Sequence, residues 1–270
     1  MRVSLAAPQS QPPSAAGPYE VYAVRYGVLP QFRVSGLVAG ADPSRRLDIP
    51  VAFWVVKRPD GRAVLVDCGF YRERLIEQWK VRDYVKPSLA IAALGLQPQD
   101  ITDIVITHMH WDHAGSLDLF PKATVWMQRD EFAYYTDDAW QPGGAHGGIE
   151  PDDVLAAVRA NTEGRLRLLG KDQEVLPGLD AHQGGCHTHA SQFVSVKTAA
   201  GTVVLASDNI YLYENLEKQT PVAGADRVCN LDAQQRILAL ASDPRLIVPG
   251  HDPAVFSKFA AVSPGVVRIR

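Results

Sequence analysis

Residues 104–113 read Ile104-Val105-Ile106-Thr107-His108-Met109-His110-Trp111-Asp112-His113. The first four are apolar or β-branched, which predicts a short buried strand. The next six hold three imidazoles and one carboxylate directly beyond the end of that strand. A turn after a strand can aim alternate side chains at one point, and imidazole nitrogen with carboxylate oxygen suits a zinc-like divalent ion. This segment therefore predicts a metal site.

Three further candidate ligands follow short apolar runs downstream. They are His187 after a Gly-Gly-Cys run, Asp208 after residues 203–207, and His251 after Val-Pro-Gly. A strand followed by a ligand, repeated along the chain, is what a metal site on the rim of a sheet requires. Adventitious surface histidines are the alternative interpretation of the first cluster, and the ordered downstream ligands argue against it.

Together these positions resemble the ligand set of the metallo-β-lactamase superfamily. Val64-Leu65-Val66-Asp67-Cys68-Gly69 also resembles the early strand and buried aspartate of that superfamily, so the resemblance covers about residues 20 to 259. It implies an α/β fold, the αββα four-layer sandwich, and two divalent metal ions. The implied ligands of one ion are His108, His110 and His187, those of the other are Asp112, His113 and His251, and Asp208 is implied to bridge the two.

The implied metal pair determines the reaction class. Two ions about 3.5–4 Å apart lower the pKa of a bridging water towards neutrality, which supplies hydroxide without a protein general base. The resemblance therefore implies a hydrolase, in which one ion also polarises the substrate carbonyl and Asp112 and Asp208 serve as catalytic residues. Zinc is the expected metal, with Mn²⁺, Fe²⁺ and Co²⁺ left open because nitrogen and oxygen ligands do not decide between them.

Tyr211, three residues beyond Asp208, indicates one branch of the superfamily. N-acyl-homoserine lactonases carry a tyrosine at that offset, where its hydroxyl reaches the substrate carbonyl or the leaving oxygen; such a donor contributes about 2.7–4 kcal/mol. The resemblance thus implies opening of a lactone ring, N-acyl-homoserine lactone above all, and a role in quorum quenching. A core tyrosine satisfied elsewhere is the alternative. The zinc β-lactamases differ at Asp208, and flavo-diiron oxygen reductases carry glutamate in place of His110, so both are disfavoured.

One segment departs from the lactonase pattern. The chain reads Cys186-His187-Thr188-His189-Ala190 where lactonases read Gly-His-Thr-x-Gly. We expect His187 to be the ligand because its threonine neighbour matches, and His189 to lie behind the site or in solvent. The departure keeps open a second hypothesis, hydrolysis of another lactone, cyclic amide, ester or thioester in a catabolic pathway. A metal-binding protein without catalysis on the same scaffold is a third.

Several neighbours of the ligands have predicted roles. Strand-like alternation should turn Met109 and Trp111 away from the metals. Asp67 is expected to accept a hydrogen bond from a ligating imidazole. The glycine-rich segment from Tyr134 to Pro151 is either a flap over the site or an ordinary surface loop, with His146 facing solvent.

Apolar runs predict the secondary structure. Strands are expected at residues 20–26, 51–57, 63–67, 104–107, 124–127, 193–198, 202–207 and 246–248, and helices at 72–81, 88–94, 152–160 and 232–241. Residues 28–50 show little strand periodicity and are expected to form a loop, whose apolar side chains either anchor it or wall a pocket.

The whole chain fits one enzyme unit. It has 270 residues, of which 46% are hydrophobic. Because the ligands span residues 108 to 251 and must converge, we expect a single metallo-hydrolase domain over 19–270, preceded by a flexible arm over 1–18. The net charge of −3 and the lack of a basic block disfavour a nucleic-acid partner. No apolar run is long enough to span a membrane. The expected partner is a small lactone or ester, with a homodimer possible.

The three cysteines give no disulfide framework. We therefore expect Cys68, Cys186 and Cys229 to be free and buried, and the protein to be cytoplasmic, with a trimmed or atypical secretion signal not excluded.

Overall fold

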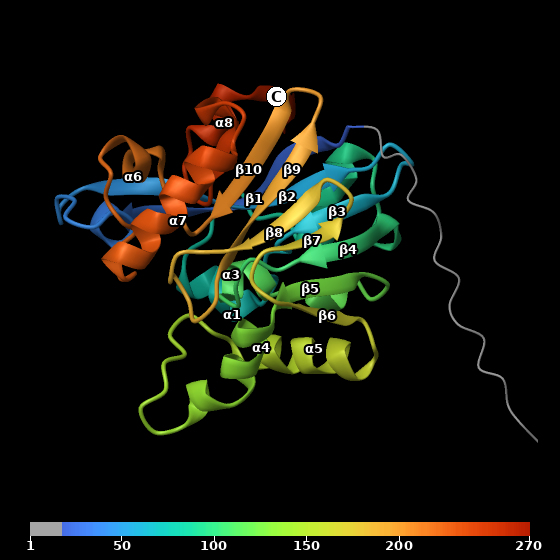
Figure 1. Ribbon diagram of the computed structural model, residues 1–270, viewed down its shortest axis with the longest axis horizontal. Helices are drawn as coiled ribbons and strands as arrows, with labels where there is room; N and C mark the ends of the chain where they lie inside the picture. Colours follow the sequence, from blue (N-terminus) through green and yellow to red (C-terminus); the bar gives the residue numbers. More distant parts are fainter. Residues whose placement is uncertain (1–17) are drawn as a thin grey trace, which may run out of the picture.

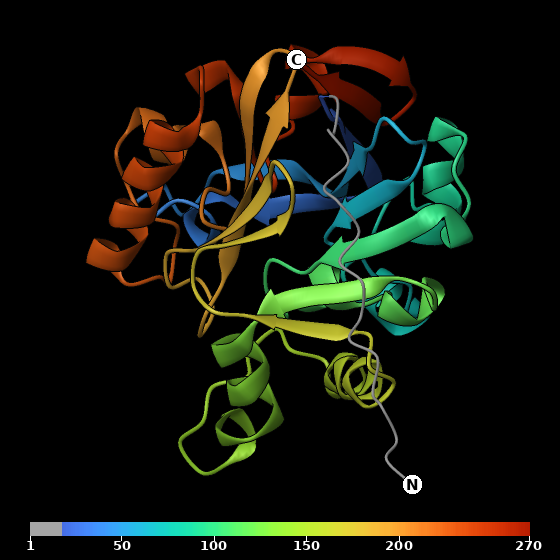
Figure 2. The same cartoon turned by 45° about the vertical axis from the view of Figure 1, so that its right-hand side comes forward.

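The computed structural model describes residues 18–270, and the predicted arm lies outside the described residues apart from Pro18. The described strands form two mixed sheets (Figures 1 and 2). The larger sheet has the order β12-β13-β1-β2-β3-β4-β5-β6, with β1 (Glu20–Arg33), β2 (Arg46–Lys57), β3 (Ala63–Val66), β4 (Ile101–Val105), β5 (Thr124–Gln128), β6 (Leu166–Leu169), β12 (Ala260–Ser263) and β13 (Val266–Ile269). The smaller has the order β11-β10-β9-β8-β7, with β7 (Gln173–Leu176), β8 (Leu179–Gln183), β9 (Gln192–Thr198), β10 (Gly201–Ser207) and β11 (Ile247–Pro249).

Helices cover the outer faces of the two sheets (Figure 2). Those packed on the larger sheet include α1 (Glu73–Gln78), α2 (Pro87–Ala90), α4 (Arg129–Thr136) and α5 (Pro151–Thr162), and α7 (Arg227–Leu240) packs on the smaller one. The short helices α3 (Trp111–Ala114), α6 (Tyr213–Glu217) and α8 (Val255–Lys258) lie in the connections.

Three hydrophobic clusters fill the spaces between these layers. Alternation along β10 shows how: Val203 and Leu205 point into the cluster between the sheets, whereas Val204 and Ala206 point into the cluster beneath α7. In β3 the alternation separates the inter-sheet cluster from the one beneath α1, α2, α4 and α5 in the same way. Strands buried on both faces read as continuous apolar runs, as these do. The predicted αββα four-layer sandwich is confirmed, and the single domain over 19–270 stays a prediction.

The parallel pairs β3–β4 and β10–β11 place four chain segments at one end of the sandwich. In parallel strands the carboxyl ends share an edge, and ligand sites gather there. Asp67, His108, Asp208 and His251 all follow such ends. Asp67 and Ser207 adopt positive φ values of 61° and 47° there, an uncommon conformation that concentrates at functional sites.

Every predicted strand and helix is present, with shifted ends, but the loop predicted over 28–50 is wrong. β1 continues to Arg33 and β2 begins at Arg46, and their pairing extends through Leu29↔Ile49 to Phe32↔Leu47 across a register shift. Irregular pairing breaks the alternation that marks a strand in sequence, while the partner strand still stabilises the extended backbone. The strands β6, β7, β8, β12 and β13 were not predicted.

The expectation of three free cysteines is also wrong. Cys186 and Cys229 form a disulfide that joins the turn before His187 to α7, and only Cys68 is free and buried. Two isolated cysteines 43 residues apart carry no recognisable spacing motif, so only the folded chain brings them together. The cytoplasmic expectation rested on reduced cysteines and loses that support. Among the described residues, no helix is both long enough and apolar enough to cross a membrane.

We expect the variant Cys229→Ser to lower the free energy of unfolding by about 2–4 kcal/mol, because the disulfide no longer restricts the unfolded chain. The measurement is guanidinium denaturation of the metal-free protein with and without dithiothreitol. The reductant should lower the midpoint of the native protein and leave that of the variant unchanged. A native midpoint insensitive to the reductant would contradict the disulfide.

Candidate metal centre

The structure brings all seven predicted ligands together in two groups. Within each group the donor atoms lie within 4.8 Å of one another. The first group is His108, His110, His187 and Asp208, and the second is Asp112, His113 and His251. His108 and His110 come from the turn after β4, His187 from the loop between β8 and β9, and the others from α3 and from the ends of β10 and β11. Segments far apart in the sequence therefore meet at one point.

Asp208 lies between the groups. Its Oδ2 is 3.5 Å from His108 Nε2 and 3.2 Å from His187 Nε2. Its Oδ1 is 3.1 Å from His251 Nε2 and 3.5 Å from His113 Nε2. One carboxylate oxygen thus faces each group, which is the placement required of a bridging ligand.

The chemistry of these atoms fits a pair of divalent ions. Asp208 Oδ1 and His113 Nε2 are buried and have no hydrogen-bond partner, a costly state for polar atoms unless another group compensates. His110 Nδ1 lies 3.0 Å from His108 Nε2 and 2.9 Å from His187 Nε2, so three ring nitrogens converge. Such nitrogen and oxygen donors suit zinc and related ions, and the residues present fit a dinuclear site.

The ring nitrogens that face away from the centre are held by other groups. His113 Nδ1 lies 2.8 Å from Asp67 Oδ2, and His251 Nδ1 lies 3.0 Å from the carbonyl oxygen of Pro50. The Asp67 carboxylate also accepts hydrogen bonds from the backbone N–H and the hydroxyl of Thr107. Such contacts fix the ring orientation and raise the basicity of a ligand. Asp67 therefore contacts a ligand ring as the sequence predicted.

Burial and neighbouring charges shift the pKa values of the candidate ligands in different directions. Burial lowers the pKa of His108 well below its usual range and that of His110 to about 3, so both rings are neutral. Burial would also lower the pKa of His113, but Asp112 and Asp208 outweigh it and raise that pKa. Burial would raise the pKa of Asp208, but His113 and His251 hold it well below the usual range, so this carboxylate is ionised.

Tyr211 lies at the centre, as predicted. Its ring centroid is 5.4 Å from that of His187 and 5.5 Å from that of His251. Burial and the Asp208 carboxylate raise the pKa of Tyr211 well above its usual range, so the phenol is protonated and can donate a hydrogen bond. Tyr211 borders a cavity of about 350 Å³, whose other lining residues are Leu29, Phe32, Leu37, Ile49, Trp79, His110, Trp111, Asp112, Gly147, Gly148, Asp208 and His251.

The two histidines predicted to lie outside the ligand set lie outside both donor groups. His189 is exposed and stacks on Tyr134 with ring centroids 4.1 Å apart. His146 is exposed and stacks on Trp140, with Nδ1 2.8 Å from the carbonyl oxygen of Ala139. The choice of His187 over His189 is therefore consistent with the geometry.

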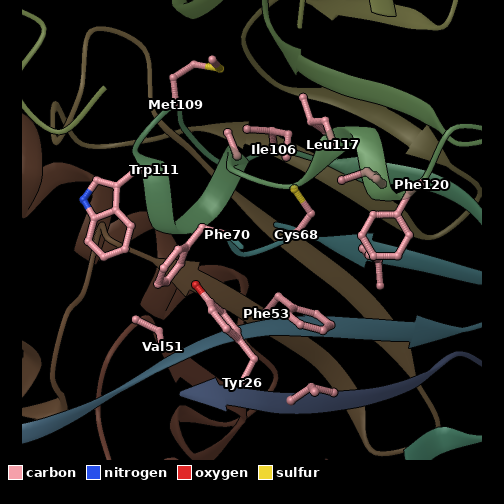
Figure 3. Close-up of a cluster of buried hydrophobic side chains, with 14 of the residues drawn as sticks. Tyr26, Val51, Phe53, Cys68, Phe70, Ile106, Met109, Trp111, Leu117 and Phe120 are labelled. Atoms are coloured by element: carbon pink, nitrogen blue, oxygen red, sulfur yellow. The ribbon is translucent and has the colours of Figure 1, made fainter. Parts of the chain in front are cut away.

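Met109 and Trp111 are buried, as alternation predicted, and Figure 3 shows both within the apolar cluster. Trp111 packs edge-on against Phe70 and stacks on Trp79, with centroids 4.6 and 5.5 Å away. Trp111 also borders the cavity. Trp111 therefore contacts both the core and the site.

Sequence reasoning missed three residues that shape the site: Glu131, Gly148 and Asn209. Gly148 packs against His110, because a Cβ there would lie 2.7 Å from His110 Cδ2, and its φ of +77° also favours glycine. Its carbonyl accepts a hydrogen bond from Trp111 N. The segment from Tyr134 to Pro151 thus borders the site, and its glycine pairs were the only feature of the sequence that indicated this.

Asn209 Oδ1 accepts a hydrogen bond from Gly185 N in the segment that precedes His187.

We expect Asp67→Asn to weaken metal binding about 10- to 100-fold, because His113 loses the carboxylate behind its ring. Metal affinity is measured by competition with a chromogenic chelator. Asp103→Asn is the matched control: Asp103 is also buried but bonds Trp126 and Thr102 on β4 and β5 rather than a ligand. Equal effects of the two substitutions would contradict the role of Asp67.

Comparison with known proteins agrees with this geometry. Residues 46–251 match the metallo-beta-lactamase superfamily. An N-acyl homoserine lactonase of a Bacillus species is 27% identical over 225 residues, which cover 78% of this chain and 84% of that protein. An N-acyl homoserine lactonase of Rhizobium johnstonii is 27% identical over 235 residues, covering 78% and 85%.

Solved structures agree in fold. A quorum-quenching N-acyl homoserine lactone lactonase superposes with a TM-score of 0.75 at 22% identity, covering 93% of this chain and 99% of that one. An N-acyl homoserine lactone hydrolase with N-hexanoyl-L-homoserine bound at its catalytic metal centre gives 0.74 at 21% identity, covering 93% and 100%. The ligand run, the four-layer fold and the match over residues 46–251 agree, and the chain belongs to the metallo-beta-lactamase superfamily.

Proposed function

We propose that this metal-dependent hydrolase opens lactone rings, and that its substrates are N-acyl-homoserine lactones. The observation that carries the proposal is the position of Tyr211, which lies beside the bridging carboxylate of Asp208 and borders the same cavity as the two donor groups. The cavity has polar groups at the donor atoms and apolar side chains elsewhere. An acyl-homoserine lactone has a polar lactone ring and an apolar acyl chain, which match these two parts.

Divalent ions held by the two groups would supply hydroxide at neutral pH and polarise the lactone carbonyl. Side chains of the protein would stabilise the negative charge on the carbonyl oxygen and transfer the proton to the leaving oxygen. The protonated hydroxyl of Tyr211 can donate a hydrogen bond to the carbonyl oxygen as negative charge develops there. Asp112 borders the cavity with Oδ2 3.4 Å from His113 Nε2. Its carboxylate can accept a proton during attack and return it to the ring oxygen that leaves.

The remaining cavity wall suits an acyl chain. Leu29, Phe32, Leu37, Ile49 and Trp79 give it an apolar surface that begins beside the ligands. Phe32 stacks on Trp79, which in turn stacks on Trp111, so three aromatic rings form one continuous wall. Burial of a hydrocarbon chain against such a wall contributes about 25 cal/mol per Å². The lactonase relatives, and the N-hexanoyl-L-homoserine seen in a similar structure, support the same substrate class.

We expect Asp208→Ala to abolish lactone hydrolysis, since neither donor group keeps its shared carboxylate. Tyr211→Phe should lower kcat about 10²- to 10³-fold while the metal content stays unchanged, because only the hydrogen-bond donor is lost. Proton release from N-hexanoyl-homoserine lactone in weak buffer measures both. Tyr213→Phe is the matched control, since its hydroxyl bonds the carbonyl of Ile247. A Tyr211→Phe enzyme as fast as the native one would show that the phenol takes no part.

Phe32→Ala should reduce kcat/KM about tenfold more for a decanoyl than for a butanoyl substrate. Loss of about 50 Å² of apolar contact costs about 1.3 kcal/mol, and we expect only the longer chain to reach that part of the wall. The measurement is a kcat/KM series over acyl-chain length, in which the short substrate is the internal control. A uniform loss over the series would place the acyl chain elsewhere.

If the ring-opening assay is negative while metal is bound, the same panel extended to esters, thioesters and cyclic amides separates the alternative hydrolases. The segment around His187 is the reason to include them. Ala190 stands where the lactonase pattern has a glycine, and the exposed His189 directly precedes it.

A further inference from the structure

Glu131 is a buried acid that neither the ligand set nor the lactonase resemblance includes. It lies in the first turn of α4 with 1% of its surface exposed. Among the described residues, no Lys or Arg forms an ion pair with it. Burying a carboxylate without a cationic partner is energetically unfavourable unless hydrogen-bond donors surround it.

Three donors surround it, and they come from the two segments that carry the three imidazoles of the first group. Glu131 Oε1 accepts hydrogen bonds from the backbone N–H of Met109 at 3.0 Å and from the hydroxyl of Thr188 at 2.8 Å. Glu131 Oε2 accepts from the backbone N–H of Ala190 at 2.7 Å. One side chain therefore connects the turn after β4 with the loop between β8 and β9.

The positions of these donors relative to the ligands are specific. Met109 stands between His108 and His110, and Thr188 directly follows His187. The three imidazoles of the first group are thus all adjacent to a residue that Glu131 bonds. None of the second group, Asp112, His113 and His251, is bonded by Glu131 or directly flanked by a residue that it bonds.

Other contacts join the same two segments farther from the ligands. The backbone N–H of Gln192 donates to the carbonyl of Thr107, and its side-chain amide donates to the carbonyl of Ile106. These bonds fix the strand ends. The turns that carry the imidazoles begin beyond them, and there Glu131 supplies the connection.

We propose that Glu131 is a positioning residue that fixes His108 and His110 relative to His187 and so sets the metal affinity of the first group. The proposal rests on the metal centre that the proposed function requires. A site whose ligands are already placed binds its ion without the cost of ordering two separate turns. The second group takes its support from Asp67 and Pro50 instead, so the effect of Glu131 should be confined to one ion.

The carboxylate is required, rather than a side chain of the same shape. All three contacts are N–H or O–H donors, and an ionised carboxylate is acceptor-only. A glutamine of equal size would present its NH₂ either to Ala190 N or to Met109 N, leaving one buried N–H without an acceptor.

The test is the metal affinity of Glu131→Gln, measured with Co²⁺ and Zn²⁺ on metal-free protein by chelator competition. We expect one ion to bind about 10- to 100-fold more weakly and the other to bind as in the native protein. His187→Ala and His251→Ala serve as references, since each removes a ligand from one group. The absorption spectrum of Glu131→Gln with one equivalent of Co²⁺ should match that of His187→Ala and differ from that of His251→Ala.

A second pair of variants covers the case in which Glu131→Gln does not fold. Thr188→Val removes one of the three bonds and should weaken the same ion to a smaller degree, whereas Thr188→Ser keeps the hydroxyl and should restore native affinity. Asp103→Asn again controls for loss of a buried carboxylate away from the centre, and should leave both affinities unchanged.

Two native-like affinities in Glu131→Gln, or an equal loss at both sites, would overturn the proposal, because a residue that only supports the fold would not select one ion. A native chain that binds no ion at all would overturn the metal centre itself. The two failures are therefore distinguishable without any measurement of lactone hydrolysis.

Discussion

The two oxygens of the Asp208 carboxylate face different groups of imidazoles, and the rest of the site depends on that arrangement. A buried carboxylate among buried imidazoles is unfavourable unless charge and hydrogen bonding compensate. The chain holds these groups together with parallel strands that end at one edge and with the Asp67 carboxylate behind His113. The Glu131 carboxylate also joins the two turns that carry the imidazoles of the first group. Divalent ions held by the two groups would complete the compensation, since Asp208 Oδ1 and His113 Nε2 have no hydrogen-bond partner.

The four-layer packing makes this arrangement possible. Both sheets bury both of their faces, so their cores are rigid and their strand ends are fixed in position. Ligands on short turns beyond rigid strands can then be placed closely enough for a shared carboxylate. The aromatic wall of Phe32, Trp79 and Trp111 links the same core to the cavity, so the groups that would act on a carbonyl lie at one end of an apolar surface.

The sequence predicted the parts of this account that depend on local patterns. The run from His108 to His113 follows a strand, and strand-then-ligand spacing together with the family resemblance indicated His187, Asp208 and His251, which the structure brings to the same place. It did not predict Glu131, whose three partners lie 22 to 59 residues away, nor the disulfide across 43 residues. It also assigned residues 28–50 to a loop, because the register shift between β1 and β2 disturbs the alternation. Each of these features is set by pairing between distant segments, which no local pattern encodes.

The measurement that tests the central claim most directly is a metal titration of the metal-free protein, followed by the rate of proton release from N-hexanoyl-homoserine lactone. The two donor groups predict that the rate rises with added Zn²⁺ and stops rising near two ions per chain. A chain that binds about two ions and opens no lactone ring at any loading would contradict the proposed function.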